Sequence, residues 1–377
     1  MNIFGEASPT AILILSEETI AGHCCSINYS VYDIEKQNVG QVFLSGVIKM
    51  DRYSKYKERI TIRPGQPSYS LAKGIRENII YNEQGNIGGR PVLKLVKALI
   101  NSNLYISVAA VFLTIETQIG LGMKPQWHPY LFIIFFATLF EYNLHRFITV
   151  ITNKEALNSD KHKWVRENLN GFYLLVLTSL AGFICVALLA KKEVLITLAP
   201  IALLTLFYSM PVFWNKKSIF KLREIPYLKI FLIAFVWASS TILLPIIQSN
   251  TMFNKAHVIT MLAERFFFIF AITIPFDIRD IEVDKQAGLK TIPILFNENT
   301  SNAIANLSLF IFFLISFVHY QSQNYWFIIG ALSISTLTTF LFLNENKFRK
   351  LTYFHYGILD GTMLLQGLLV LVFYYLK

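Results

Sequence analysis

Nine long apolar stretches, separated by short polar connections, run through the chain from about residue 96 to its C-terminus. They cover residues 96–120, 129–152, 171–190, 193–213, 227–249, 257–276, 302–320, 325–343 and 358–376. These lengths approach or reach the roughly 20 residues that an α-helix needs to cross a bilayer. Helices of a large soluble protein would carry polar faces, which are scarce here. The pattern predicts an all-α, polytopic integral membrane protein with about nine transmembrane helices around a central cavity.

The first 91 residues follow a different pattern. Short alternating runs, such as residues 41–48 and 59–63, predict a few strands, and Pro64-Gly65 supplies a break. A poorly ordered tail fits the same composition, and the sequence leaves both alternatives open. We therefore predict an N-terminal extension of unknown role at 1–91 and a transmembrane domain at 92–377.

Charge and composition change the picture of the chain's surroundings. A net charge of +10 would point to nucleic acid if the protein were soluble, but 54% of its residues are hydrophobic and its mean hydropathy is +0.47. Fifteen Lys and Arg residues follow the even-numbered apolar stretches, whereas four follow the odd-numbered ones. The positive-inside rule then places the N-terminus and the even-numbered connections in the cytoplasm. We expect a bacterial inner membrane, membrane lipid as a partner and no nucleic acid.

The strongest candidate chemistry follows the sixth apolar stretch. Asp277, Asp280 and Asp284 are spaced at i, i+3 and i+7, so a continuous helix would place them on one face. Carboxylates at this depth are costly and usually mark a site. Mg²⁺ binds a few carboxylates together with water and substrate phosphate. The spacing predicts a Mg²⁺ site for a phosphorylated ligand, in a cavity that opens to the cytoplasm.

A second charged pair, Glu264-Arg265, lies inside the same apolar stretch. The sequence leaves two interpretations open for it. Either the two residues pair with other helices, or Arg265 lines the cavity.

Residues 277–293 have the pattern D-I-x-D-I-E-x-D-x-x-A-G-x-x-T-x-P. This pattern resembles the second aspartate motif of the UbiA superfamily of intramembrane prenyltransferases, which lies after the sixth of nine helices. Two weaker similarities agree in position. Tyr208-Ser209-Met210-Pro211 precedes a basic cluster after the fourth stretch, and residues 141–146 end the second stretch. The resemblance covers roughly residues 95–377.

The chain departs from that family at the first motif, which is Asn-x-x-x-Asp-x-x-x-Asp. Counting from Asn143, the two aspartate positions hold Phe147 and Ile151. In the family, the two motifs together hold two Mg²⁺ ions between their carboxylates and the diphosphate. The half of this arrangement that the first motif supplies is missing here. Glu141 and Arg146 stand nearby, and Arg146 could bind phosphate directly or anchor the helix at the headgroups.

The resemblance implies transfer of an isoprenyl group from an isoprenyl diphosphate to an unidentified hydrophobic acceptor. It assigns Asp280 and Asp284 to Mg²⁺ and diphosphate, and Asp277 to the metal or to orienting Arg279. Glu141 is a further metal candidate. Asn143, Arg146, Tyr208 and Lys290 are candidate diphosphate contacts. The alternative is a catalytically decayed protein of the same fold that binds lipid or isoprenoid in the membrane.

Overall fold

The computed structural model of the chain describes residues 11–21, 24–33, 38–42, 48–49, 91–152, 165, 168–209, 213–215, 218–220, 225, 227–249, 252–286 and 288–377. The chain divides into two compact units, Met1–Pro91 and Val92–Lys377.

In its described part, the first unit contains four strands. They are β1 (Ala11–Ala21), β2 (Cys24–Asp33), β3 (Asn38–Val42) and β4 (Ile48–Lys49). All pairings are antiparallel, with β2 joined to β1, β3 and β4. Strands were one of the two alternatives that the sequence left open. The run at 59–63 lies outside the described residues, and the role of this unit stays open.

The second unit is helical apart from one short hairpin in its described part, which confirms the predicted all-α membrane fold. Its early helices are α2 (Pro91–Asn101), α3 (Leu104–Gly120), α4 (Pro129–Thr152), α6 (Leu169–Leu188) and α7 (Lys192–Ser209). The hairpin pairs β5 (Phe213–Asn215) with β6 (Ser218–Phe220). The later helices are α8 (Leu228–Ser249), α9 (Lys255–Arg279), α10 (Ile281–Gln286), α11 (Ile292–Ser322), α12 (Trp326–Asn344), α13 (Asn346–Arg349), the π-helix η3 (Phe354–Leu359) and α14 (Asp360–Leu376).

Seven helices in the described part of the chain are long and apolar enough to cross a membrane, so the protein is an integral membrane protein. An eighth span is formed if the bent pair of α2 and α3, which meet at 74°, counts as one. The predicted span at 193–213 corresponds to α7, which is not among these, and part of that stretch lies outside the described residues. The count of nine therefore stays a prediction.

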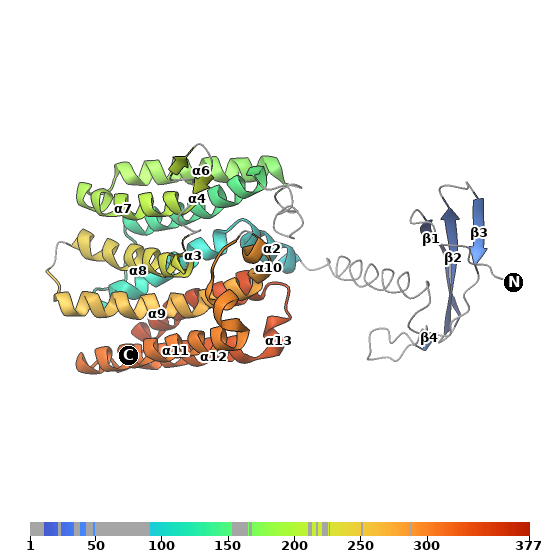
Figure 1. Cartoon of the computed structure of the whole chain (residues 1–377). Coiled ribbons are helices and arrows are strands. Elements are labelled where there is room, and N and C mark those ends of the chain that lie inside the picture. The colour runs from blue at the N-terminus through green and yellow to red at the C-terminus, as the bar shows by residue number, and fades with distance from the viewer. Residues whose placement is uncertain are drawn as a thin grey trace. The chain divides into compact units, whose positions relative to one another are not determined.

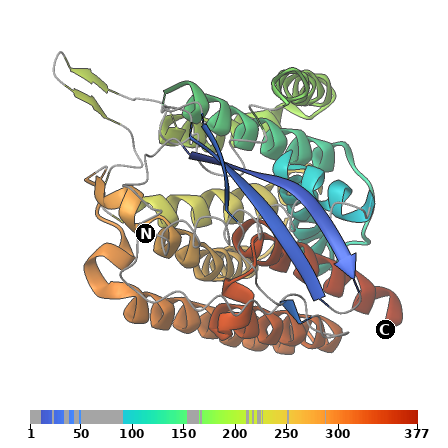
Figure 2. The same ribbon diagram turned by 90° about the vertical axis from the view of Figure 1, so that its right-hand side faces the viewer.

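The long helices run side by side (Figure 1), with α4 and α6 at one side of the unit and α11 and α12 at the other (Figure 2). Helix α9 packs between α8 and α11, and α14 packs against α3. A Cβ built on Gly367 of α14 would lie 2.4 Å from the carbonyl oxygen of Phe112. This glycine lets two backbones approach closely, as small residues commonly do between membrane helices.

The orientation of the spans is a prediction that labelling can check. Asn299 lies near the start of α11, and Gln323 follows its last residue, so cysteines at these positions should react from opposite sides of the membrane. The background is a variant in which Cys24, Cys25 and Cys185 are replaced by serine. Asn299 should react from the cytoplasmic side. Reaction of both positions from one side would refute the spanning of α11, and reaction of Asn299 from outside would reverse the orientation.

Candidate functional site

The aspartate segment forms a break between two helices. Helix α9 ends at Arg279, Asp280 is its C-cap, and α10 begins at Ile281. One helix-like hydrogen bond crosses the break, from the backbone N–H of Asp284 to the carbonyl of Asp280 at 2.8 Å. Asp277 and Asp284 are buried, whereas the side chain of Asp280 is 31% exposed. The spacing predicted that the three carboxylates share one face of a continuous helix. Because the helix breaks at Asp280, they do not.

The ammonium group of Lys229 brings two of the aspartates together. Lys229 lies in the first turn of α8, and its Nζ is 2.8 Å from Oδ1 of Asp277 and 3.1 Å from Oδ2 of Asp284. The Asp284 contact has hydrogen-bond geometry. The Asp277 contact is a close ion pair, and no other donor among the described residues contacts its buried Oδ1.

Asp280 has a separate partner. The guanidinium of its neighbour Arg279 donates two hydrogen bonds to it, from Nε to Oδ1 at 2.7 Å and from Nη2 to Oδ2 at 3.1 Å. That guanidinium also lies over the rings of Phe276 and Tyr356, 5.3 and 4.8 Å from their centroids. The structure thus brings together Asp277 and Asp284, rather than Asp280 and Asp284. It pairs Arg279 with Asp280, rather than with Asp277.

Two candidate residues of the first motif hold a bend in the backbone. Asn143 accepts a hydrogen bond from Asn103 at 3.0 Å and donates to the carbonyls of Ser102 and Leu139. Arg146, which is buried, donates to the carbonyl of Asn101 and, at 2.7 Å, to Oδ1 of Asn103. Asn103 has a positive φ of 63°, which asparagine tolerates better than most residues. These contacts satisfy polar backbone where α2 bends into α3.

The other face of the same motif lines a cavity. A cavity of about 440 Å³ lies between α4, α6, α7 and α8, and its lining is mostly apolar. The polar residues of the lining are Thr138, Glu141, Tyr142, His145, Thr205 and Ser240. Glu141 and His145 are one turn apart on α4, so both can face the same space. The sequence named Glu141 as a metal candidate, and the structure places it in this cavity wall.

Helix α8 connects the cavity to the aspartates. Leu232 and Ile233 line the cavity, and they lie one turn after Lys229 on the same face of α8. Of the described residues, neither Lys229 nor the three aspartates belongs to the lining itself. Because neighbouring spans alternate in direction, the ends of α4 and α9 lie at the same end of the unit as the start of α8. Figure 1 shows α2 and α10 at that end.

Two candidate diphosphate contacts remain, Lys290 and Tyr208. Lys290 is exposed, and its carbonyl accepts a hydrogen bond from the backbone N–H of Tyr227 at 3.0 Å, which joins the α10–α11 connection to the start of α8. Tyr208 lies in the last turn of α7, but its side chain is outside the described residues. In the part of the chain that the structure describes, no group of three or more His, Cys, Asp or Glu side chains could hold a metal ion.

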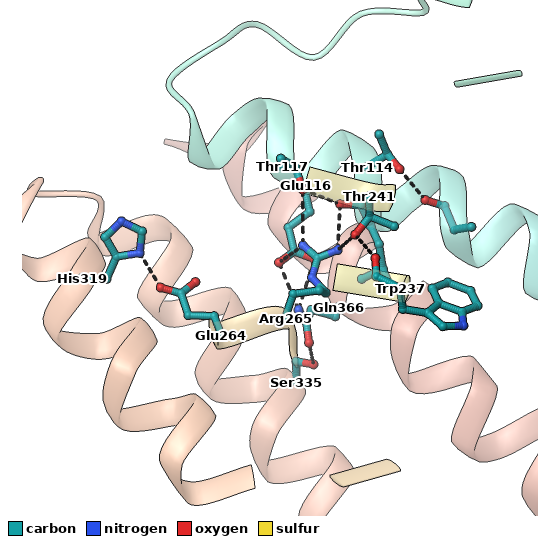
Figure 3. Close-up of polar contacts among 12 residues, drawn as sticks. Thr114, Glu116, Thr117, Trp237, Thr241, Glu264, Arg265, His319, Ser335 and Gln366 are labelled. Atoms are coloured by element: carbon teal, nitrogen blue, oxygen red, sulfur yellow. Dashed lines mark hydrogen bonds and ion pairs between the residues drawn. The ribbon is translucent and has the colours of Figure 1, made fainter. Parts of the chain in front are cut away.

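Sequence reasoning singled out Glu264-Arg265 but missed their partners in a polar network inside the membrane unit (Figure 3). Arg265 of α9 forms an ion pair with Glu116 of α3 at 3.0 Å, and Gln366 of α14 donates to both carboxylate oxygens of Glu116. Glu264 pairs with His319 of α11 instead. Of the two interpretations left open for Glu264-Arg265, the structure supports pairing with other helices. A buried Glu116 was the available signal, because it interrupts the first apolar stretch.

Lys229 was also missed as a site residue. In the sequence it counts only as one of the basic residues that follow the fourth apolar stretch. Its position at the start of the fifth stretch gives no indication that it reaches two acids about 50 residues further along the chain.

Comparison with solved structures gives matches at low sequence identity. A UbiA homologue from Aeropyrum pernix K1 is 13% identical, and the match covers 73% of this chain and 97% of that chain with a TM-score of 0.48. A UbiA homologue from Archaeoglobus fulgidus, bound to GPP and Mg²⁺, is 15% identical over 72% of this chain and 99% of that chain, with a TM-score of 0.49. Comparison with curated protein sequences gives no match.

Comparison with protein-family models gives a match to the UbiA prenyltransferase family over residues 167–356, half of the chain. This segment contains Lys229 and the α9–α10 aspartates, and it begins after the divergent end of α4. The match agrees with the resemblance that residues 277–293 carry. The chain belongs to the UbiA prenyltransferase family.

Proposed function

We propose that the protein transfers an isoprenyl group from an isoprenyl diphosphate to a hydrophobic acceptor within the membrane. The observation that carries this proposal is the placement of Lys229, which contacts Asp277 and Asp284, one helical turn from a largely apolar cavity. The cavity has the size and lining of a small-molecule site. An isoprenyl diphosphate has the matching chemistry, because it joins an apolar chain to a polyanionic head.

The donor set fits one Mg²⁺ ion in this proposal. Asp277 and Asp284 already converge on one cation, and Mg²⁺ commonly takes one or two carboxylates plus substrate phosphates. Asp280 would join them only after leaving Arg279. When bound, the ion would neutralise charge on the diphosphate as the carbon–oxygen bond breaks. Glu141 lies in the cavity wall, so it is a poorer candidate for the same ion.

The residues of the chain have three roles in the proposed reaction. Lys229 and the exposed Lys290 bind diphosphate oxygens, which stabilises the leaving group. The aromatic and aliphatic cavity wall keeps water away from the allylic cation. Asn143 and Arg146 hold the α2–α3 bend through hydrogen bonds, so the proposal no longer assigns them to the diphosphate. The acceptor stays unidentified.

The proposal places this chemistry at the cytoplasmic face of a bacterial inner membrane. The support is the excess of Lys and Arg in the even-numbered connections, which include the loop after α9. Isoprenyl diphosphates are water-soluble at the head and would reach the site from that side.

Filling the cavity tests the proposal. Ala202 of α7 lines the cavity, so Ala202→Trp should displace part of the isoprenyl chain. Each displaced methylene costs about 0.8 kcal/mol, and two of them weaken binding about tenfold. The measurement is the Kd of a labelled isoprenyl diphosphate with the purified protein in detergent.

The control is Ala303→Trp on α11, because Ala303 is exposed and lies outside the cavity wall. It should leave the Kd within twofold (about 0.4 kcal/mol). Inorganic pyrophosphate should bind both variants like the unaltered protein, since it has no chain to place. Equal Kd values for the two tryptophan variants would contradict the cavity as the chain site.

A second candidate function is lipid or isoprenoid binding without transfer. The observation that favours it is that each aspartate of the motif is already paired with a cation of the protein. A diphosphate-release assay with an isoprenyl diphosphate and a mixture of aromatic and lipid acceptors separates the two. Binding with release supports the transferase, and binding without release supports the second candidate.

A further inference from the structure

The ammonium group of Lys229 occupies the position between two buried carboxylates. Its side chain is 17% exposed, whereas those of Asp277 and Asp284 are 3% and 8% exposed. Two ionised carboxylates that converge on one point repel each other in a buried setting, so a cation between them stabilises their charged forms. In the described structure that cation belongs to the protein.

Asp277 contacts the ammonium group through one buried oxygen. Oδ1 lies 2.8 Å from Lys229 Nζ, and no other donor among the described residues contacts it. Lys229 is therefore the cation that compensates the charge of this carboxylate. A metal ion at this position would compensate the charge of that oxygen at least as well, because a hard cation binds oxygen ligands at close range.

The side chain of Lys229 is also flexible and partly exposed. Lys229 lies in the first turn of α8, its stem is flexible, and its side chain keeps some exposure at the end of the unit where α10 lies. The other motif aspartate does not hold it, because Asp280 is engaged by Arg279.

We propose that Lys229 acts as a tethered substitute for the divalent cation and moves onto the diphosphate when the metal–diphosphate complex binds. This inference rests on the proposed function and names how its site is regulated. Before binding, the ammonium group neutralises Asp277 and Asp284 and excludes free metal. On binding, the metal takes the two carboxylates and Lys229 pairs with phosphate oxygen. No covalent bond changes in this step. Metal and diphosphate then promote each other's binding, as linkage requires.

The test uses Mn²⁺ alone as the probe, and its binding is monitored through the paramagnetic signal of the ion. Lys229→Met keeps the length of the stem and removes the charge. Without diphosphate, this variant should bind Mn²⁺ at least about tenfold more tightly than the unaltered protein, since a competing cation is gone. With Mn²⁺ saturating, it should bind a labelled isoprenyl diphosphate more weakly. The control is Lys285→Met on α10, whose exposed side chain pairs only with Glu282 among the residues described.

Equal Mn²⁺ affinity in the Lys229→Met variant and the unaltered protein would overturn the proposal. If the variant does not fold, thermal unfolding of the unaltered protein decides the question at fixed free Mn²⁺. Mn²⁺ and isoprenyl diphosphate together should raise the unfolding temperature by more than their separate effects combined. Mn²⁺ alone giving the full shift would overturn the proposal.

The outcomes for the two proposals differ. Cooperative binding of Mn²⁺ and diphosphate without diphosphate release would support the Lys229 exchange and refute the transferase. Diphosphate release together with unchanged Mn²⁺ affinity in the Lys229→Met variant would support the transferase and refute the exchange.

Discussion

Replacing Arg265 with methionine is expected to destabilise the membrane unit by about 3–5 kcal/mol. Arg265 is 3% exposed and is the cationic partner of Glu116, which is 6% exposed. Methionine fills similar space but leaves the carboxylate of Glu116 buried without its counter-ion. The hydroxyls of Thr117 and Thr241 lose little, because each also donates to a backbone carbonyl within its own helix. The loss therefore arises mainly at Glu116.

Thermal unfolding in detergent measures this effect, with Lys347→Met as the control. Lys347 pairs with Glu345 at 4.0 Å with both side chains exposed, so its loss should cost less than about 1 kcal/mol. A double variant, Glu116→Gln with Arg265→Met, removes both charges and keeps the hydrogen bond from Gln366 possible. It should recover most of the lost stability. If the double variant is as unstable as Arg265→Met alone, the unpaired carboxylate of Glu116 is not the cause of the lost stability.

Much of the fold follows from the sequence because membrane spans depend on local properties. The length and apolar content of a stretch determine whether it can cross the bilayer, and seven of the predicted stretches match described helices of that kind. The bend between α2 and α3 was missed within one stretch. Asn101, Ser102 and Asn103 interrupt it with three polar residues, and Asn103 takes the left-handed conformation.

The sequence singled out the aspartate segment as the candidate site, but it did not predict the contacts that these aspartates make. The prediction of one shared face failed because it assumed an unbroken helix through Asp284, whereas α9 ends at Arg279. Once the helix breaks, spacing no longer determines which carboxylates converge. The cation between Asp277 and Asp284 comes from α8, and no local pattern predicts a contact across about 50 residues.

The divergent end of α4 illustrates the same limit. Asn143 and Arg146 were natural diphosphate candidates because they stand where the family's first motif belongs. Their partners come from the bend after α2, more than 40 residues earlier. The face that carries Glu141 and His145 lines the cavity instead. Neighbouring positions on a helix face different surroundings, and a sequence motif alone does not tell which face is turned to the site.

Asp284→Asn is expected to have the largest effect on substrate binding. The substitution keeps the size of the side chain and removes one of the two carboxylates that converge on the cation position. It should weaken Mg²⁺-dependent binding of an isoprenyl diphosphate by about 100-fold, a typical cost of about 3 kcal/mol for a desolvated charged contact. Glu282→Gln is the matched control two residues away, because the side chain of Glu282 is 81% exposed and pairs only with Lys285 in the described structure.

The decisive measurement is one titration of Mg²⁺ against binding of a labelled isoprenyl diphosphate to the unaltered protein and to these two variants. Binding should require Mg²⁺ and fit one ion better than two. It should weaken strongly in Asp284→Asn and change little in Glu282→Gln. Binding that is independent of Mg²⁺, or equal losses in the two variants, would contradict the claim that the α9–α10 aspartates hold the diphosphate through a divalent cation.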